Sequence, residues 1–215
     1  MKSIDYMQVT KLIDERISVV LKNEQPKNPA QRNGVIKSAF SKMAADLGID
    51  CRCSQPKGRG EFMVDVCWLE RDKTSLIPTL SACHMAGEIE LNPYADMKDM
   101  YKLLLMKSPL KVYVHSPAKY MSGTNVLRFV RAIQDYNQHS SNEIYHFMEI
   151  SKDNRVVTTA TYIHEERKLS LGIEQSKQFD EIMRRIGDDY GDERDEVVRE
   201  SLKRRVPTDI NFMRR

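Results

Sequence analysis

Apolar side chains recur along the chain with two different periods, and the change of period separates predicted helices from predicted strands. Residues 6–21 and 35–47 carry apolar side chains at helical spacing, with a polar, proline-containing stretch between them. Within residues 61–70 the apolar side chains occupy both alternating sets of positions, which is typical of a strand buried on both faces. A second long strand is predicted over residues 76–91, and an Asn-Pro pair ends it.

Helices and strands alternate in the next part of the sequence. Helices are predicted over residues 95–107 and 125–136, and short apolar strands over residues 110–115, 144–151 and 156–164. This order predicts an α/β fold, α+β in the wider sense, in which helices surround one mixed sheet.

Two parts of the chain differ in composition. Residues 1–170, the N-terminal helices included, contain the alternating pattern and are predicted to form one α/β domain. Residues 171–215 are rich in charged side chains and are predicted to form a helical C-terminal extension.

Composition excludes several classes of protein. The chain is 40% hydrophobic, which is enough apolar material for a sizeable core and argues against general disorder. No apolar run approaches the roughly 18–20 residues of a membrane-spanning helix, and the first residues lack the apolar segment of a secretory signal. With four cysteines interpreted as reduced thiols, these features predict an intracellular, cytoplasmic protein without a membrane partner. The net charge of +3 means that any basic surface must be local.

Three carboxylates on the two predicted strands are the most informative candidates for chemistry. Asp65 interrupts an otherwise apolar strand, and Glu88 and Glu90, two residues apart, project from one face of the next strand. A hairpin would bring all three together, and Mg²⁺ or Mn²⁺ would offset the cost of burying them. A metal ion held in this way can promote phosphodiester hydrolysis. The alternative is that the Glu-x-Glu pair lies on a solvated or salt-bridged strand face.

The order of these motifs resembles the core of the PD-(D/E)XK, restriction-endonuclease-like superfamily of nucleases. The matching segments are VDVCW (64–68), GEIEL (87–91), DMKDMYKLLL (96–105) and LKVYVH (110–115). The resemblance covers about a quarter of the chain, residues 61–115. It implies a restriction-endonuclease-like core with flanking helices, in which Asp65 and Glu88 correspond to the metal-binding acids.

The chain departs from the family pattern at two positions. Glu90 occupies the place of the family's lysine, and Val64 occupies the place of the proline before the aspartate. Some members carry a glutamate in place of the lysine, and in others the lysine lies on the following helix. Lys102, or as an alternative Lys98, would then supply the charge that steadies the scissile phosphate or the attacking water. The competing interpretation of Lys102 is a surface lysine paired with Asp99 one helical turn away.

A short basic segment, Cys51–Gly60, precedes the strand that contains Asp65. Arg52, Lys57 and Arg59 are interleaved with glycines there, which suits contact with a phosphate backbone and equally suits a solvated loop. His84 is expected on the same strand face as Glu88 and is a weaker catalytic candidate, as are His115 and Glu149. Cys67 and Cys83 are interpreted as core residues, and the alternative is a zinc site formed by the four cysteines with His84.

Three functional hypotheses follow from the sequence. The first is a Mg²⁺- or Mn²⁺-dependent nuclease acting on DNA, or on RNA, in which Asp65, Glu88, Glu90 and Lys102 serve catalysis and the basic segment binds nucleic acid. The second is a nucleic-acid-binding or assembly protein on the same scaffold without catalysis. The third is a protein–protein adaptor. The apolar stripe of the N-terminal helices also makes a homodimer conceivable.

Overall fold

A computed structural model describes residues 4–54, 63–72, 79–92, 98–116 and 124–171. Residues 172–215 of the predicted C-terminal helical extension lie outside these residues, as do Lys57 and Arg59, and Leu171, the first residue of that extension, ends a strand instead of a helix. The elements in chain order are α1 (Tyr6–Glu24), α2 (Pro29–Asp46), β1 (Asp50–Cys53), β2 (Val66–Asp72), β3 (Thr79–Glu90), α3 (Lys98–Leu105), β4 (Leu110–His115), α4 (Thr124–Asp135), β5 (Ile144–Ile150), β6 (Val156–Ile163) and β7 (Lys168–Leu171).

All seven described strands form one mixed sheet, and their order in the sheet is the same as their order in the chain. The pairs β3–β4 and β4–β5 are parallel, and the other four pairs are antiparallel. Each parallel pair is joined through a helix, α3 or α4, as parallel pairing requires. The predicted α+β class with a mixed sheet is therefore confirmed.

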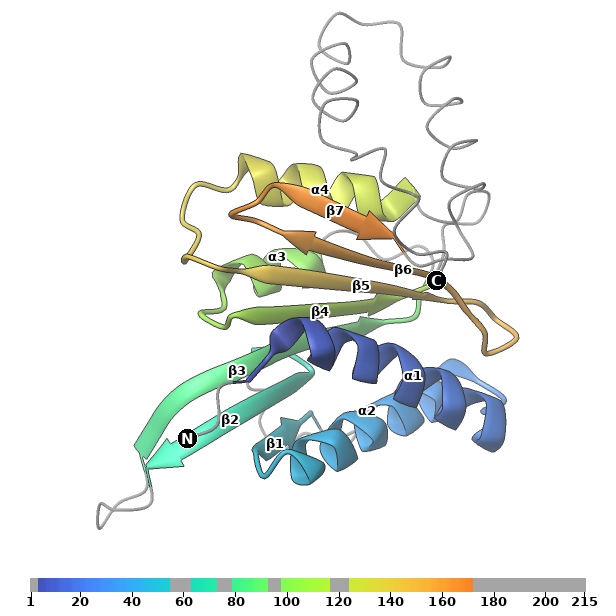
Figure 1. The fold of residues 1–215 in the computed structure, drawn as a ribbon. Coiled ribbons are helices and arrows are strands. Elements are labelled where there is room, and N and C mark those ends of the chain that lie inside the picture. The colour runs from blue at the N-terminus through green and yellow to red at the C-terminus, as the bar shows by residue number, and fades with distance from the viewer. Residues whose placement is uncertain (1–3, 55–62, 73–78, 93–97, 117–123, 172–215) are drawn as a thin grey trace, which may run out of the picture.

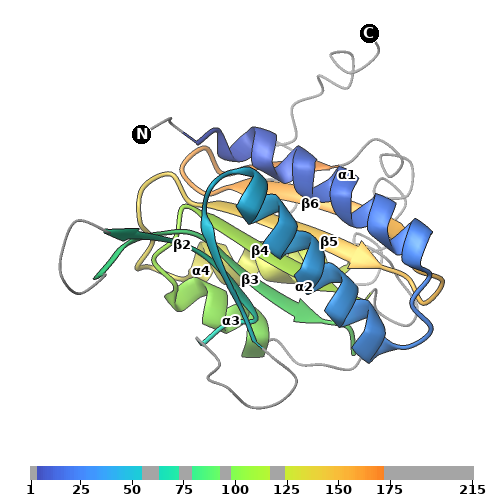
Figure 2. The same ribbon diagram turned by 90° about the horizontal axis from the view of Figure 1, so that it is seen from below.

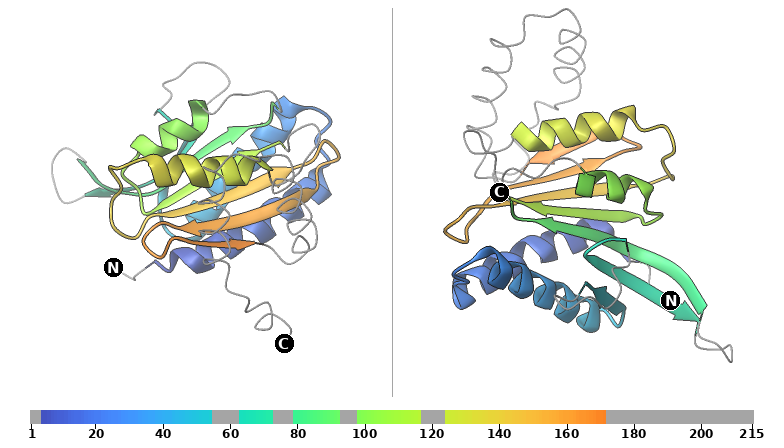
Figure 3. Two further views of the ribbon diagram at one scale, coloured as in Figure 1. Left: turned by 90° about the horizontal axis from the view of Figure 1, so that it is seen from above. Right: turned by 180° about the vertical axis from the view of Figure 1, so that it is seen from behind.

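Helices cover both faces of the sheet (Figures 1 and 2). On one face α1 packs over β5 and β6, and α2 packs over β1 and β2. On the other face lie α3 and α4 (Figure 3). Two buried apolar clusters, one on each face, follow from the alternation of side chains along the strands.

The first two helices begin with polar caps. Asp5 accepts hydrogen bonds from the amides of Met7 and Gln8, and Asn28 accepts one from the amide of Gln31 before Pro29 starts α2. The apolar stripe of α1 is covered by the chain's own sheet, since Ile13 and Ile17 are fully buried. That stripe consequently provides no argument for a dimer.

Two short strands were not predicted. Asp50–Cys53, expected to belong to a basic loop, forms β1 and pairs with β2, and Lys168–Leu171 forms the opposite edge of the sheet as β7. Both have four residues and little apolar periodicity, so their pairing depends on a neighbouring strand rather than on a local pattern. No helix within the described ranges is long and apolar enough to cross a membrane.

Candidate functional site

The strands β3, β4 and β5 run parallel, so their carboxyl ends meet at one edge of the sheet. Open α/β sheets bind ligands at such an edge. Three of the four predicted catalytic residues, Asp65, Glu88 and Lys102, are brought together beside it, with Glu90 at the end of β3.

Asp65 lies immediately before β2, not within the strand as the sequence suggested. The alternation of side chains breaks there: Val64 packs with the cluster under α3, whereas Val66 packs with the cluster under α1 and α2. The Asp65 carboxylate accepts the backbone N–H of Ile89 on β3, at 3.0 Å from Oδ2. The Ile89 amide thus bonds to a side chain of the segment before β2 instead of to a backbone carbonyl, and this bond fixes the position of the Asp65 carboxylate.

The second oxygen of Asp65 has two side-chain partners. Oδ1 lies 2.7 Å from Nζ of Lys37 on α2 and 2.6 Å from the hydroxyl of Ser54. Burial raises the pKa of Asp65, but the hydrogen bonds from Lys37 and Ser54 outweigh burial and hold that pKa below its ordinary value. Asp65 is therefore a negative charge at neutral pH.

Glu88 lies on β3 in the opposite electrostatic situation. Glu88 is 3% exposed, and its Oε1 atom has no hydrogen-bond partner among the described residues. The Lys102 ammonium lies 3.3 Å from Oε1, but its alignment does not make a hydrogen bond. Burial and the negative charge of Asp65 raise the pKa of Glu88 to about 8 and outweigh the attraction of Lys102.

Lys102 connects the two interpretations that its sequence position allowed. Its Nζ donates to Asp99 at 2.7 Å across one turn of α3, and the same atom approaches Glu88. The hydrogen bond to Asp99 raises the pKa of Lys102. Lys102 therefore pairs with Asp99 on the helix surface and at the same time lies close to the buried Glu88.

Glu90 occupies the last position of β3 and is half-buried. Its Oε1 accepts the backbone N–H of Asn92 at 2.6 Å. Burial raises its pKa, and the neighbouring Asp99 and Asp65 act in the same direction. Glu90 therefore lies at the rim of the site, one pleat beyond Glu88.

Lys37 is the residue at this site that sequence reasoning missed. It sits on α2, 28 residues before Asp65 and on the other side of the sheet from α3. In the sequence it resembles any other polar position of an amphipathic helix, so no local signal could have identified it.

A further row of ionisable side chains extends the site along the edge. Glu90, His115 and Glu149 are in register across β3, β4 and β5, and His115 and Glu149 are both buried. His115 lies against Phe129 of α4, and its Nδ1 donates to the carbonyl of Ser116 at 3.1 Å. Its Nε2 is buried without a hydrogen-bond partner within the described part of the chain, and burial lowers its pKa. A neutral imidazole with a free Nε2 lone pair follows from this bonding.

The remaining candidates lie apart from the acids. Arg52 is exposed on β1, opposite Cys67 of β2. His84 was expected on the same strand face as Glu88, but a bulge in the β2–β3 ladder turns it toward Tyr6 of α1 and Glu70. The expectation of a shared face is therefore wrong.

The cysteines form no zinc site with His84. Cys51 and Cys53 lie 3.5 Å apart, beside Ser41 of α2, while His84 bonds to Tyr6 and Glu70. Over the ranges that the structure describes, no three side chains of the types His, Cys, Asp or Glu converge to hold a metal ion by themselves. A metal at Asp65 and Glu88 would need further ligands from water and substrate, which is the usual arrangement for Mg²⁺.

Comparisons of the chain with models of known families, with curated proteins and with solved structures returned no match.

Proposed function

We propose that the chain is a divalent-metal-dependent nuclease with a restriction-endonuclease-like core, which hydrolyses phosphodiester bonds in DNA, with RNA as the alternative substrate. One observation carries the proposal. Glu88 holds a buried carboxylate oxygen without a hydrogen-bond partner in the described part of the chain, close to the charged carboxylate of Asp65. A buried, incompletely paired acid is costly, and a cation is the natural partner for it.

The arrangement of elements supports the resemblance to the nuclease superfamily. Asp65 precedes β2, Glu88 and Glu90 end β3, Lys102 lies on α3, and β4 pairs in parallel with β3. The residues that would hold Mg²⁺ or Mn²⁺ are Asp65 and Glu88, with Glu90 at the rim. A bound metal ion supplies an activated water and polarises the phosphoryl oxygen. Lys102 would place its positive charge beside the phosphate, and its pairing with Asp99 holds it there.

Calorimetric titration with Mn²⁺ at pH 7.5 tests the metal site. The wild type, Glu88→Gln and Asp65→Asn are compared, with Glu70→Gln on β2 as the matched control, because Glu70 pairs with His84 away from the site. We expect binding by the wild type and the control only. Since Glu88 holds a proton below about pH 8, binding should release a proton, and the measured heat should depend on the buffer. Equal binding by all four proteins would overturn the proposal.

A cleavage assay follows with Mg²⁺ or Mn²⁺ on supercoiled plasmid, single-stranded DNA and RNA. Glu88→Gln and Asp65→Asn should each lose about 100-fold or more in rate, as expected for residues that position the metal and its water. Lys102→Met should lower the rate without abolishing metal binding.

A non-catalytic nucleic-acid-binding protein on the same scaffold is the second candidate, and the contacts of Asp65 favour it. Both oxygens of Asp65 are already occupied, by Lys37 and Ser54 on one side and by the Ile89 amide on the other. If these contacts persist in the presence of metal ions, the role of Asp65 is to stabilise the fold and not to bind a metal. Nucleic-acid binding that persists in EDTA, with no heat from Mn²⁺, would support this second function.

A further inference from the structure

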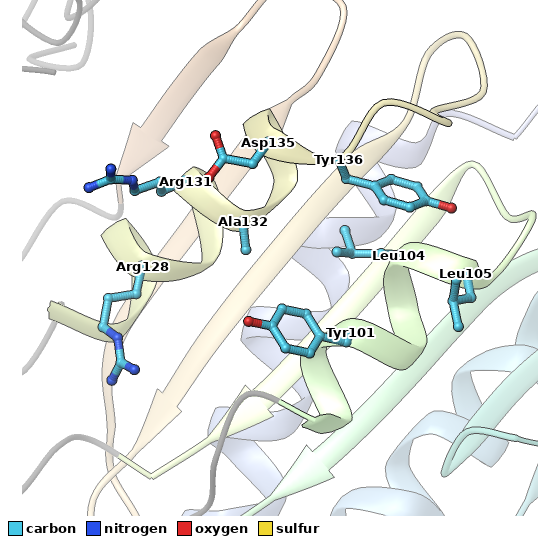
Figure 4. Close-up of a pocket in the computed structure, with 8 residues that line it drawn as sticks. All are labelled: Tyr101, Leu104, Leu105, Arg128, Arg131, Ala132, Asp135 and Tyr136. Atoms are coloured by element: carbon cyan, nitrogen blue, oxygen red, sulfur yellow. The ribbon is translucent and has the colours of Figure 1, made fainter. Parts of the chain in front are cut away.

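A groove between α3 and α4 lies outside the acidic site and has its own chemistry (Figure 4). Its volume is about 640 Å³, and the residues that line it are Tyr101, Leu104, Leu105, Arg128, Arg131, Ala132, Asp135 and Tyr136. Pockets of roughly 300–1,000 Å³ are large enough to enclose most of a small ligand. We call this feature the α3–α4 groove.

The α3–α4 groove begins at the same edge of the sheet as the acids. Each of its helices follows a parallel strand, so the N-termini of α3 and α4 both lie at the carboxyl ends of β3 and β4. Tyr101, in the first turns of α3, is the sequence neighbour of Lys102, which approaches Glu88. The groove and the acidic site therefore share one helix.

Two arginines give the groove its charge. Arg128 and Arg131 lie three residues apart on α4 and are exposed. Neither makes an ion pair or a hydrogen bond within the described part of the chain, whereas Arg16, on the opposite face, pairs with Asp46. Asp135 is the single acidic residue of the lining, so the groove carries a positive charge overall.

Aromatic side chains complete the lining. Tyr101 is 49% exposed and projects from α3 toward α4, and Leu105 beside it is 61% exposed (Figure 4). An exposed tyrosine next to unpaired arginines is the combination that binds single strands, because the ring stacks on a base while the guanidinium groups contact phosphates. Bases of a duplex are already stacked on each other and leave no face for Tyr101.

We propose that the α3–α4 groove binds a single strand of nucleic acid, with Tyr101 stacked on a base and Arg128 and Arg131 on adjacent phosphates. The strand then runs toward the carboxyl edge of the sheet. Its use as the path of the substrate into the acidic site rests on the proposed nuclease function, but the binding itself does not.

Fluorescence anisotropy with labelled oligo-dT, oligo-U and a duplex of equal length tests the proposal in EDTA, where no cleavage occurs. We expect both single strands to bind more tightly than the duplex. Tyr101→Ala should weaken binding about fivefold or more. Arg128→Ala with Arg131→Ala should reduce the slope of log affinity against log salt by about 1.4, since each phosphate contact on a single strand contributes about 0.7.

Two further variants control for general charge effects. Arg16→Ala removes one positive charge from the opposite face and should leave the salt slope unchanged, while Asp135→Asn should tighten binding. Because all five substituted positions, Arg16, Tyr101, Arg128, Arg131 and Asp135, are exposed, the variants should fold like the wild type, and circular dichroism verifies this before binding is measured. An unchanged salt slope in the double arginine variant, or tighter binding of the duplex, would overturn the proposal.

The two proposals fail separately. Glu88→Gln should abolish cleavage and keep oligo-dT binding with its full salt slope. Oligo-dT binding at the groove without any metal-dependent cleavage would support the groove proposal and refute the nuclease proposal. Unchanged cleavage in the Tyr101 and arginine variants would refute the groove as the path of the substrate, and unchanged oligo-dT binding in the same variants would refute the groove as a binding site; either result would leave the nuclease proposal intact.

Discussion

Two buried carboxylates lie close to lysines at opposite ends of the parallel strands, and their surroundings differ. Glu143, just before β5, receives Lys111 Nζ at 2.7 Å and the Ser140 amide at 3.1 Å on Oε1. Its Oε2 receives His139 and the Tyr145 hydroxyl, each at 2.7 Å. Glu88 is buried to a similar degree, yet Lys102 is its near cation and its Oε1 makes no hydrogen bond in the described structure.

The pKa values of the two acids are consequently shifted in opposite directions. Burial raises the pKa of both, but the hydrogen bonds from Lys111, His139 and Tyr145 outweigh burial and hold the pKa of Glu143 below its ordinary value. At Glu88 burial wins, and the pKa is raised to about 8. Glu143 is thus a completed structural ion pair, whereas Glu88 has unused capacity for a ligand. Burial of a charged residue alone does not separate structure from function, whereas the state of its hydrogen bonds does.

The largest effect is expected from breaking the completed pair. Lys111→Met leaves Glu143 without its main countercharge and should lower the free energy of unfolding by about 3–5 kcal/mol. Urea unfolding followed by fluorescence of Trp68 measures this, because Trp68 is the single tryptophan and is buried. Lys102→Met is the matched control and should cost less than about 1 kcal/mol, because Lys102 is 39% exposed. Similar losses of free energy of unfolding in both variants would show that Lys111 and Lys102 contribute equally to stability, and the proposed contrast between Glu143 and Glu88 would be wrong.

A pH series should separate the two acids next. The folded-state pKa of Glu88, about 8, exceeds the ordinary 4.5, so the folded protein holds a proton that the unfolded chain releases. The stability from this group is fully present below pH 4.5, declines as the pH rises and is lost above pH 8. Glu88→Gln cannot titrate, so its free energy of unfolding should gain roughly 4 kcal/mol relative to wild type between pH 5 and pH 8.5.

The same series on Glu143→Gln provides the contrast. The pKa of Glu143 is lowered, so its stabilisation is present above the ordinary pKa and is lost as the pH falls through the lowered value. This variant should be less stable than wild type at both pH 5 and pH 8.5. A Glu88→Gln variant that behaves in the same way would show that Glu88 too is a structural acid.

A smaller effect is expected at Lys37. Lys37→Met removes the charge that lies 2.7 Å from Asp65, so the pKa of Asp65 should rise, as carboxyl NMR titration can measure. If a metal ion and Lys37 compete for the same oxygen, the variant should also bind Mn²⁺ about tenfold more tightly, near 1.4 kcal/mol. Lys42→Met, an exposed lysine on the same helix, serves as control. Weaker Mn²⁺ binding by Lys37→Met would mean that Lys37 orients Asp65 for the metal instead.

The sequence by itself determined the long elements and the acids of the edge. Apolar periodicity over many residues identified α1, α2, β3 and α4, because burying an amphipathic face is a property of the segment itself. The hairpin and the Glu-x-Glu spacing were enough to predict that Asp65 and Glu88 lie near each other, and the Asp65–Ile89 bond confirms the neighbourhood.

Tertiary structure alone decided what each ionisable group does. β1 exists through its pairing with β2, and the bulge that turns His84 away from Glu88 depends on register between two strands. Lys37 reaches Asp65 from another helix, and nothing local distinguishes Glu88 from Glu143 as buried glutamates. Hydrogen-bond satisfaction and desolvation depend on groups that arrive from distant parts of the chain, so they are set only when the sheet and its helices come together.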